Sequence, residues 1–369
     1  MKKTIWTVVV IIVLIIVALL LSAGKGSPSS TGPIKVGFIG PLTGDASSLG
    51  EVAKAAVELA TDEINAAGGV NGRQINVTYE DGKCGADASQ AANKLVNVDG
   101  VSLIVGGLCS GETASFVKDI GNKIPVVSYC SSAPTLSGAA KFFSRDYPSD
   151  AFQGKYAAEY LYNTLGARKV VVFYHISDWG TGVKTVFESR FKELGGQIVD
   201  EEGTPQTAKD YRTEIAKIKT FSADYIYMPM FPEGGTVAVN QLNQLGVKTK
   251  IFGADAWSDP KFQADVNGKG DIFYTKIKVP NNDAFNAKLL AKSGGKEIPI
   301  CAPQAYDAMK LAAQVIAQVG VDPQKFTDAL RTTTYNGVSG QISFEPNGDL
   351  ATASYAVERI ANGTEAEVK

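Results

Sequence analysis

Hydroxyl and cysteine side chains follow three of the predicted strands in the first part of the chain. Pro41–Gly44 follows the first strand, Leu108–Gly111 the third, and Cys130–Pro134 the fourth. The carboxyl ends of parallel strands meet at one edge of a sheet, so we expect these loops to lie together. Hydroxyls and free backbone N–H groups at helix N-termini bind carboxylates, and the pattern therefore predicts a carboxylate site. Ordinary helix capping by serine is the alternative for any single loop.

A second group of loops carries aromatic and acidic side chains. Trp179, Phe231 and Asp255 each lie after a predicted strand in the later part of the chain. An aromatic ring over a cleft buries apolar ligand surface, and a carboxylate such as Asp255 pairs with an ammonium group. The alternative for Trp179 and Phe231 is a place in the core.

Motifs for catalysis are missing from the sequence. No G-x-x-x-x-G-K-[ST] phosphate loop occurs, no G-x-G-x-x-G follows the first strand, and no G-x-S-x-G is present. His175 is the one histidine, and we expect it to cap a loop or line a cleft. The sequence therefore predicts a protein that is not an enzyme.

The cysteines and the net charge argue against two further classes of protein, namely metal- or cofactor-binding proteins and nucleic-acid-binding proteins. The four cysteines form no C-x-x-C pair and there is a single histidine, so we expect no metal and no cofactor. The formal net charge is -2 and basic residues form no run longer than a pair. We therefore expect no nucleic-acid partner.

The N-terminal segment predicts export. An apolar run from Ile5 to Leu21 follows two lysines, and at 1.5 Å per residue it nearly spans a hydrocarbon core of roughly 30 Å. We predict a signal peptide or membrane anchor at residues 1–24 and a flexible tether at 25–33. Gly24 stands where a lipid-attachment cysteine would lie, so no lipoprotein is expected. The remaining chain is expected outside the cytoplasm, in the periplasm or at the cell surface.

From residue 34 onward, Val/Ile-rich runs alternate with amphipathic stretches, which indicates repeated βαβ units and parallel sheets. The predicted strands are Ile34–Gly40, Gln74–Glu80, Ser102–Gly106, Ile124–Ser128, Lys169–Tyr174, Gln197–Glu201, Tyr225–Met228, Thr249–Phe252 and Ile272–Val279. The predicted helices are Ser47–Ala66, Asp87–Val98, Glu112–Asn122, Ala151–Leu165, Thr181–Leu194, Tyr211–Thr220, Gly235–Leu245, Ala302–Val319 and Pro323–Arg331.

The pattern breaks at Ser144–Asp150 and again at Pro280–Asp283, and a chain of 369 residues exceeds one ordinary core. We predict an α/β fold of two doubly wound, Rossmann-like lobes joined by three crossings. Lobe 1 takes residues 34–148 and 281–338, and lobe 2 takes 149–280 and 339–369. In the tail, Pro346–Asp349 is predicted as a tight turn between strands Ile342–Phe344 and Ser354–Ile360.

Several stretches resemble the type I periplasmic binding proteins, in particular the branched-chain amino-acid (Leu/Ile/Val) receptors of ABC importers. These stretches are Ile34–Gly44, Asp62–Gly72, Tyr79–Cys84 and Gly107–Ser110. They occur in the order and spacing of that family, and the likeness extends from about Ile34 to the C-terminus.

The resemblance implies roles for the polar candidates of lobe 1. Cys84 and Cys109 match the family's disulfide. Ser110 and Ser132 match the hydroxyls that bind the ligand α-carboxylate. Cys130 matches a position whose backbone carbonyl accepts a hydrogen bond from the α-ammonium.

The resemblance also implies the other ligand contacts. Asp255 matches an acidic residue, usually Glu, that pairs with the ammonium. Leu49 and Trp179 match aromatic or apolar positions beside the ligand, and Phe231 matches a tyrosine. Ser131 is included in the candidate site with its two neighbours in the same loop.

This sequence departs from the family pattern at several of these positions. Phe231 lacks a hydroxyl, Leu49 replaces an aromatic residue, and Asp255 is one methylene shorter than Glu. Cys130 and Cys301 either form a second disulfide beside the cleft or remain free, and we expect the disulfide because free thiols are rare outside the cell.

The function that the resemblance implies is solute capture. An extracytoplasmic receptor would close two lobes around a branched-chain or related amino acid and deliver it to a membrane permease. The crossings are expected near Tyr147–Asp150, Val279–Asn282 and Asn336–Gly340, and the protein is expected to be a monomer. The alternative is a sensor for amides, urea or other small molecules.

Overall fold

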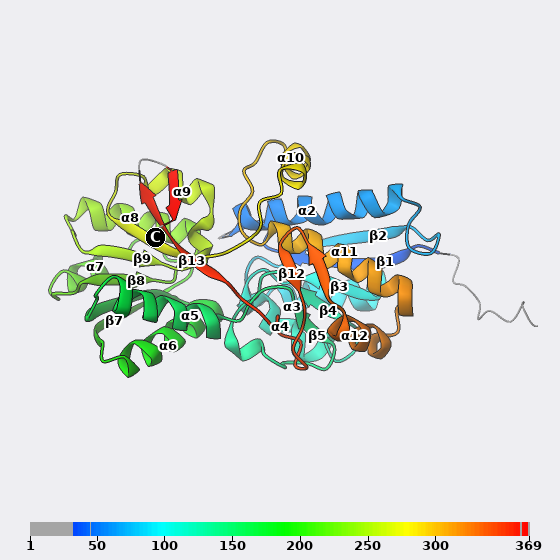
Figure 1. The fold of residues 1–369 in the computed structure, drawn as a ribbon, viewed down its shortest axis with the longest axis horizontal. Helices are drawn as coiled ribbons and strands as arrows, with labels where there is room; N and C mark the ends of the chain where they lie inside the picture. The colour runs from blue at the N-terminus through cyan, green and yellow to red at the C-terminus, as the bar shows by residue number, and fades with distance from the viewer. Residues whose placement is uncertain (1–31, 45, 362–363, 368–369) are drawn as a thin grey trace, which may run out of the picture. The chain divides into compact units, whose positions relative to one another are not determined.

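Two parallel sheets organise the computed structural model, which describes residues 32–44, 46–361 and 364–367 (Figure 1). Each sheet is covered by helices on both faces, which confirms the predicted α/β class. The described residues from Ile34 onward belong to one compact unit. The predicted export segment and tether lie outside the described residues, apart from residues 32 and 33.

The first sheet has five parallel strands in the order β2-β1-β3-β4-β5. Its strands are β1 (Ile34–Gly40), β2 (Ile75–Asp81), β3 (Leu103–Gly106), β4 (Val126–Ser128) and β5 (Phe143–Arg145). Side chains alternate between its faces, so Phe38 packs in one apolar cluster and Ile39 in the other.

Long amphipathic helices cover one face of this sheet and shorter helices the other. Figure 1 shows α2 (Ser47–Ala66) beside α11 (Ala302–Val319), and these two helices pack on each other. The remaining helices of this part are α3 (Ala88–Lys94), η1 (Leu95–Asp99), α4 (Ser110–Ile120), η2 (Pro134–Leu136), α10 (Asp283–Lys292) and α12 (Pro323–Thr332). Burial of Ala-, Val- and Leu-rich stripes explains why the sequence predicts α2 and α11 well.

The second sheet has seven strands in the order β14-β13-β10-β9-β8-β6-β7. Five of these strands run parallel to one another. At one edge of the sheet β13 pairs antiparallel with β10, and β14 pairs antiparallel with β13. The strands are β6 (Lys169–Ile176), β7 (Gln197–Pro205), β8 (Tyr225–Met228), β9 (Lys250–Gly253), β10 (Ile272–Ile277), β13 (Tyr355–Ala361) and β14 (Thr364–Glu367).

The helices of the second sheet also cover both of its faces. On β6, Val170 and Val172 pack in one cluster while Val171 and Phe173 pack in the other, as the two-residue period of a strand requires. The helices are α5 (Asp150–Glu159), η3 (Tyr160–Thr164), α6 (Asp178–Glu193), α7 (Arg212–Ile218), α8 (Pro232–Gln244), η4 (Asp255–Ser258) and α9 (Pro260–Val266).

The chain passes three times between elements of the first and the second sheet. The connections are residues 146–149, 278–282 and 343–354. The first two coincide with the predicted crossings. The predicted third crossing, Asn336–Gly340, instead belongs to the hairpin of β11 (Tyr335–Gly337) and β12 (Gly340–Ile342). The predicted boundary between lobe 1 and lobe 2 at residues 338/339 falls within this hairpin. The division of the chain into these two lobes stays a proposal.

A buried carboxylate holds this hairpin against α11. Asp307 accepts hydrogen bonds from the backbone N–H groups of Val338 at 3.0 Å and Ser339 at 2.7 Å. The predicted turn at Pro346–Asp349 forms, with Glu345 N–H donating to the Asp349 carbonyl at 2.8 Å. The strands on either side of it, however, belong to different sheets.

Several described elements escaped the sequence prediction, among them β5, α9, α10, β11 and β14. Strand β5 has three residues and α9 has seven, and both are too short to show a period. Helix α10 buries Phe285 and Leu289 alone, so its apolar stripe is weak. Each of these elements depends on tertiary contacts rather than on its own pattern.

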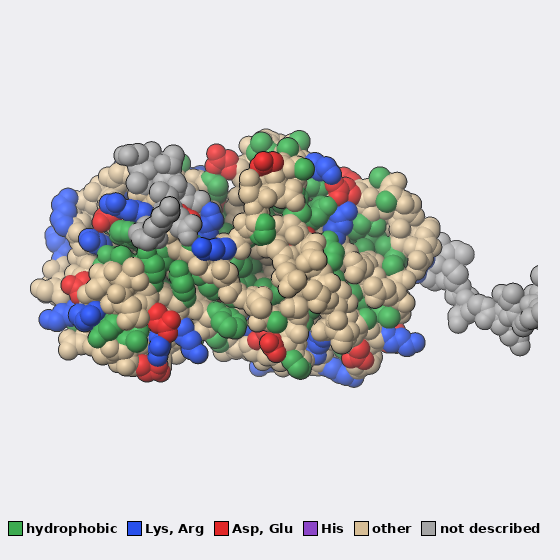
Figure 2. Space-filling model, viewed as in Figure 1, with side chains coloured by type: hydrophobic (Ala, Val, Ile, Leu, Met, Phe, Trp, Pro, Cys, Tyr) green, Lys and Arg blue, Asp and Glu red, His purple; other side chains and the backbone are tan. Residues whose placement is uncertain are grey.

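The surface shows no dominant field of one sign on the face in Figure 2, where basic and acidic side chains are interspersed. None of the helices described between residues 32 and 361 combines the length and apolar character that a membrane crossing requires.

Candidate functional site

The loop between β3 and α4 forms the first wall of the site. Gly107 has a φ of +95°, and a Cβ atom there would overlap Thr113 Oγ1, so only glycine allows this turn. Cys109 is the N-cap of α4 and Ser110 is its first residue. Ser110 Oγ accepts hydrogen bonds from the backbone N–H groups of Ser132 at 3.2 Å and Ala133 at 3.0 Å. Its own O–H therefore remains available to donate to an anionic group.

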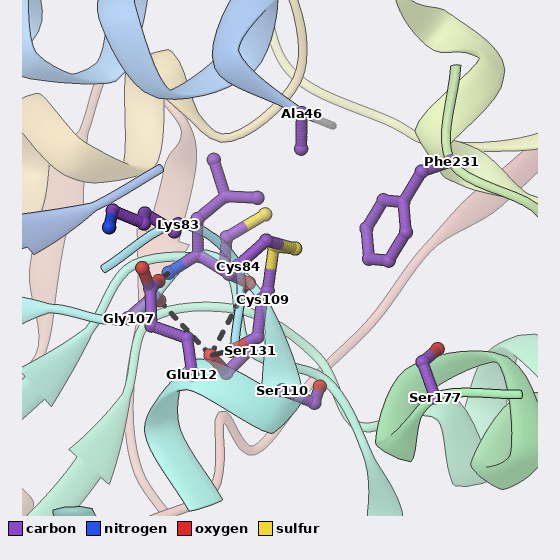
Figure 3. The surroundings of a disulfide bond; sticks show 12 residues. Ala46, Lys83, Cys84, Gly107, Cys109, Ser110, Glu112, Ser131, Ser177 and Phe231 are labelled. Atoms are coloured by element: carbon purple, nitrogen blue, oxygen red, sulfur yellow. Dashed lines mark hydrogen bonds between the residues drawn. A yellow bond between two sulfur atoms is a disulfide. The ribbon is translucent and has the colours of Figure 1, made fainter. Parts of the chain in front are cut away.

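A disulfide and a buried carboxyl group brace this loop from beneath. Cys84 and Cys109 are bonded, as predicted, with Cα atoms 5.1 Å apart (Figure 3). Glu112 Oε2 accepts a hydrogen bond from Leu108 N–H at 2.8 Å. Burial raises the pKa of Glu112 to about 7, although backbone donors such as Leu108 N–H oppose the shift.

Ser131 belongs to this bracing rather than to the cavity wall. Its Oγ lies 3.1 Å from the Gly107 carbonyl oxygen and 2.7 Å from Thr113 Oγ1. Figure 3 shows Ser131 directed at the backbone of this loop, with Phe231 on the far side of Cys109. Ser131 does not line the cavity, so this geometry gives it a bracing role rather than the predicted ligand contact.

The loop Pro41–Gly44 also stands apart from the cavity. Asp81 accepts hydrogen bonds from Leu42 N–H at 2.9 Å and from the Thr43 hydroxyl at 2.5 Å. The hydroxyl that suggested a ligand contact thus stabilises the loop. Leu49, on the first turn of α2, is the residue of this region that reaches the cavity.

Loops of the second sheet form the opposite wall. Trp179 lies in the first turn of α6, and Phe231 is the N-cap of α8. The two ring centroids are 4.7 Å apart. His175 Nδ1 accepts the Phe231 N–H at 3.2 Å, and its Nε2 lies 3.2 Å from the Tyr211 hydroxyl. His175 thus positions Phe231 from a fully buried site, in agreement with a supporting role for the histidine.

Asp255 begins η4 after strand β9 and is almost fully buried. Its Oδ2 accepts a hydrogen bond from the Tyr147 hydroxyl at 2.6 Å. Burial raises the pKa of Asp255, while hydrogen bonds such as that from Tyr147 lower it. Tyr147 comes from the 146–149 connection, so the connection itself supplies part of the wall.

One cavity collects these side chains from both sheets. The space outside protein atoms there is about 310 Å³, part of which is open to solvent. Its lining residues are Leu49, Leu108, Cys109, Ser110, Cys130, Ser132, Tyr147, Trp179, Phe231, Asp255, Ala256 and Ile300. Among the predicted site residues, Ser131 alone is not on this wall. Leu108, Tyr147, Ala256 and Ile300 were not predicted as ligand contacts, and Cys109 was predicted only as a disulfide partner.

A second disulfide closes one side of the cavity. Cys130 is bonded to Cys301, with Cα atoms 5.4 Å apart, so the predicted pairing is present. The bond ties the loop after β4 to the start of α11 and leaves Ile300 on the wall. The apolar part of the cavity therefore has a fixed side beside Cys130.

A wider groove adjoins the cavity. It has about 810 Å³ of space and shares four residues with the cavity wall, namely Cys109, Ser110, Trp179 and Phe231. Asp178 and Ser177 line its side on the second sheet. Figure 3 shows Ser177 across from Ser110. The groove and the cavity therefore adjoin along these shared residues.

The cavity combines polar groups of different character with apolar surface. Hydroxyls and a helix N-terminus face it from the first sheet, an aspartate faces it from the second, and apolar side chains lie between them. No group of three or more His, Cys, Asp or Glu side chains suited to a metal ion occurs in the described part of the chain.

The fold and site define a two-sheet solute-binding protein, and comparison with known families agrees. Residues 33–365 match the family model described as "Periplasmic binding protein", and the chain belongs to that family. The family consists of solute-binding proteins rather than enzymes.

Relatives and solved structures share this organisation over most of the chain. The Leucine-, isoleucine-, valine-, threonine-, and alanine-binding protein of Pseudomonas aeruginosa is 28% identical over 353 residues, covering 91% of this chain and 92% of its own. The LivJ branched-chain amino acid transporter substrate binding protein of Streptococcus pneumoniae, solved with isoleucine, has a TM-score of 0.81. The two sequences are 28% identical, and the match covers 91% of this chain and 99% of that protein. A benzoate-binding solute binding protein of R. palustris has a TM-score of 0.82 at 19% identity, covering 91% of this chain and 96% of its own, and shows the fold alone.

Proposed function

We propose that this chain is the extracytoplasmic substrate-binding component of an ABC importer, and that it binds an amino acid in the cavity between its two sheets. The observation that carries the proposal is that Asp255 and Ser110, which come from loops of different sheets, line one cavity. A carboxylate from one sheet and a hydroxyl at a helix N-terminus from the other match an ammonium and a carboxylate on adjacent carbon atoms.

The apolar wall supports an aliphatic side chain for the ligand. Leu49, Ile300 and the rings of Trp179 and Phe231 contribute apolar surface, and burial of such surface stabilises a bound hydrocarbon group by about 25 cal/mol per Å². Phe231 offers no hydroxyl, so Asp255 would hold the ammonium with Tyr147 as its hydrogen-bonding neighbour. Leucine, isoleucine and valine are the first candidates.

Closure of the two parts around the ligand is the proposed mechanism of capture. Glu233, on α8, accepts a hydrogen bond from Ala46 N–H at 2.9 Å and lies 3.4 Å from Ser48 Oγ at the start of α2. These contacts join elements of both sheets beside the cavity and would be lost on opening. The three connections at 146–149, 278–282 and 343–354 would act as the hinge, and the closed form would dock on a permease.

The test separates the two charged ends of the ligand. We expect calorimetry with the purified protein to show binding of L-leucine, isoleucine or valine. It should show much weaker binding of 4-methylpentanoic acid, which lacks the ammonium, and of 3-methylbutylamine, which lacks the carboxylate. Benzoate serves as a control, because it would leave Asp255 without a counter-charge. Tight binding of benzoate and none of the amino acids would contradict the proposal.

A further inference from the structure

Two buried carboxyl groups belong to the surroundings of the cavity: Asp255 lines it, and Asp150 lies behind the wall, one hydrogen bond from Ser132. One ligand ammonium would need only one of them. Asp150 is fully buried and Asp255 is 2% exposed. Ser132 Oγ, on the cavity wall, donates to Asp150 Oδ2 at 2.8 Å, and the Tyr147 hydroxyl donates to Asp255 Oδ2 at 2.6 Å. Each carboxyl group is therefore one hydrogen bond away from a hydroxyl that lines the cavity.

The two carboxyl groups are close enough for their charges to interact. Burial raises the pKa of Asp150 well above its usual range, and the charge of Asp255 raises it further. The Ser132 hydrogen bond and the charge of Arg145 act in the opposite direction. Two like charges in a buried site are costly, so one proton between them is the favoured state.

The cation that faces this pair is already engaged by other groups. Arg145, on β5, donates through Nε to Asp349 at 2.8 Å and through a terminal nitrogen to the Ala133 carbonyl at 2.9 Å. It therefore lowers the pKa of Asp150 through space but does not neutralise the pair. An uncompensated pair of buried carboxylates would carry a large desolvation cost.

Three buried phenols lie close enough to the pair to interact with its charges. Tyr147 faces it from the 146–149 connection, Tyr227 from β8 and Tyr355 from β13. Burial raises the pKa of each of these hydroxyls well above the usual value, and the nearby aspartates raise it further. None of the three supplies a positive charge, so the pair has a proton or a ligand ammonium as its counter-charge.

The hydrogen bonding of Asp150 is consistent with a protonated group. Its Oδ1 is buried and has no hydrogen-bond partner among the described residues. A buried ionised oxygen without a donor is strongly unfavourable, whereas the oxygens of a neutral carboxyl group are less so. Geometry and surroundings thus agree in assigning the proton mainly to Asp150.

We propose that Asp150 and Asp255 together hold one proton before the ligand binds, and that the ligand ammonium displaces this proton into solvent. The proposal rests on the proposed function, because the ammonium must reach Asp255. On binding, the charge of the pair changes from -1 to -2 and the ammonium adds +1. The ammonium lowers the pKa values of the pair, so affinity rises with pH in the interval between the free and bound values. Displacement of one proton makes the Kd fall by up to about tenfold per pH unit in that interval.

The experiment is calorimetric titration of the wild-type protein with L-leucine, isoleucine and valine in pairs of buffers that differ in ionisation enthalpy. The heat should depend on the buffer. In a series from about pH 5 to pH 8, close to one proton should be released per ligand wherever the pH lies between the pKa values of the bound and the free pair. Asp150→Asn should abolish the proton release and flatten the pH dependence. Asp146→Asn is the matched control, since Asp146 is equally buried and four residues away but is influenced by Asp307. It should retain the wild-type pH dependence.

The outcomes separate the two proposals. Binding without any buffer-dependent heat in the wild-type protein would overturn the proton displacement and leave the binding function standing. Equal proton release by the wild type and Asp150→Asn would overturn the assignment to this pair. If Asp150→Asn fails to fold, the wild-type proton count decides the question. No binding of any amino acid in the panel would overturn both proposals.

Discussion

Replacement of Asp255 by asparagine is the most informative single change in the proposed site. The substitution keeps the size of the side chain and removes its negative charge. Because Asp255 is 2% exposed, a ligand ammonium beside the substituted amide would lie in a buried place without its counter-charge. Truncation of one partner of a buried, hydrogen-bonded charge pair costs about 2–5 kcal/mol. At about 1.4 kcal/mol per tenfold change, the Kd should rise roughly 30- to 4,000-fold.

The assay is isothermal calorimetry with the branched-chain amino acid that binds the wild-type protein most tightly. Asp259→Asn is the matched control. Asp259 is similarly buried in the same segment and caps α9 through Phe262 N–H at 2.6 Å, which asparagine can also do, but it is not on the cavity wall. We expect the control to bind nearly as the wild type does. Unchanged affinity of Asp255→Asn, with both variants folded by melting temperature, would refute the assignment of the ammonium to Asp255.

Three further predictions concern the supports of the site. The pKa of Glu112 is raised to about 7 in the folded protein by burial, so its stabilising contribution is present below the unfolded value and is lost as pH rises through 7. Between about pH 4.5 and pH 8, the free energy of unfolding in urea should therefore fall by about 3 kcal/mol less for Glu112→Gln than for the wild type. An identical pH profile of the two proteins would contradict this. Joint replacement of Cys130 and Cys301 by alanine opens a loop of 171 residues and should lower the free energy of unfolding by about 5 kcal/mol; a change near zero would count against a structural disulfide. Glu233→Ala removes the hydrogen bonds to the start of α2 and should speed ligand release roughly 5- to 30-fold in stopped-flow measurements, from a loss of about 1–2 kcal/mol; an unchanged rate would rule out this closing contact.

The sequence predicts the long elements of this fold well because their burial is periodic. Helix α2 ends at Ala66 as predicted, before Gly68, and β1 spans the predicted Ile34–Gly40. Helix α10 shows the limit of this reasoning, because two buried residues are too few to make a stripe. The β11–β12 hairpin depends on Asp307 of α11, a partner that no local pattern identifies.

The site shows a similar division. Loops that follow strands meet at one sheet edge by topology, so Ser110 and Trp179 could be predicted as neighbours of a cleft. Side-chain directions within an irregular loop have no period, and for this reason Ser131 was not distinguished from Ser132. Tyr147 reaches the cavity from a connection between the two sheets, and its partnership with Asp255 spans 108 positions. A contact of this kind follows from the folded structure rather than from the sequence.

In the proposed site, both sheets present polar groups to one ligand, and a crystal structure with the tightest-binding amino acid is the decisive experiment. We expect a ligand nitrogen within about 3 Å of an Asp255 carboxylate oxygen and a ligand carboxylate at a similar distance from Ser110 Oγ. A ligand bound outside this cavity, or bound with its carboxylate toward Asp255, would show that the proposed site is wrong.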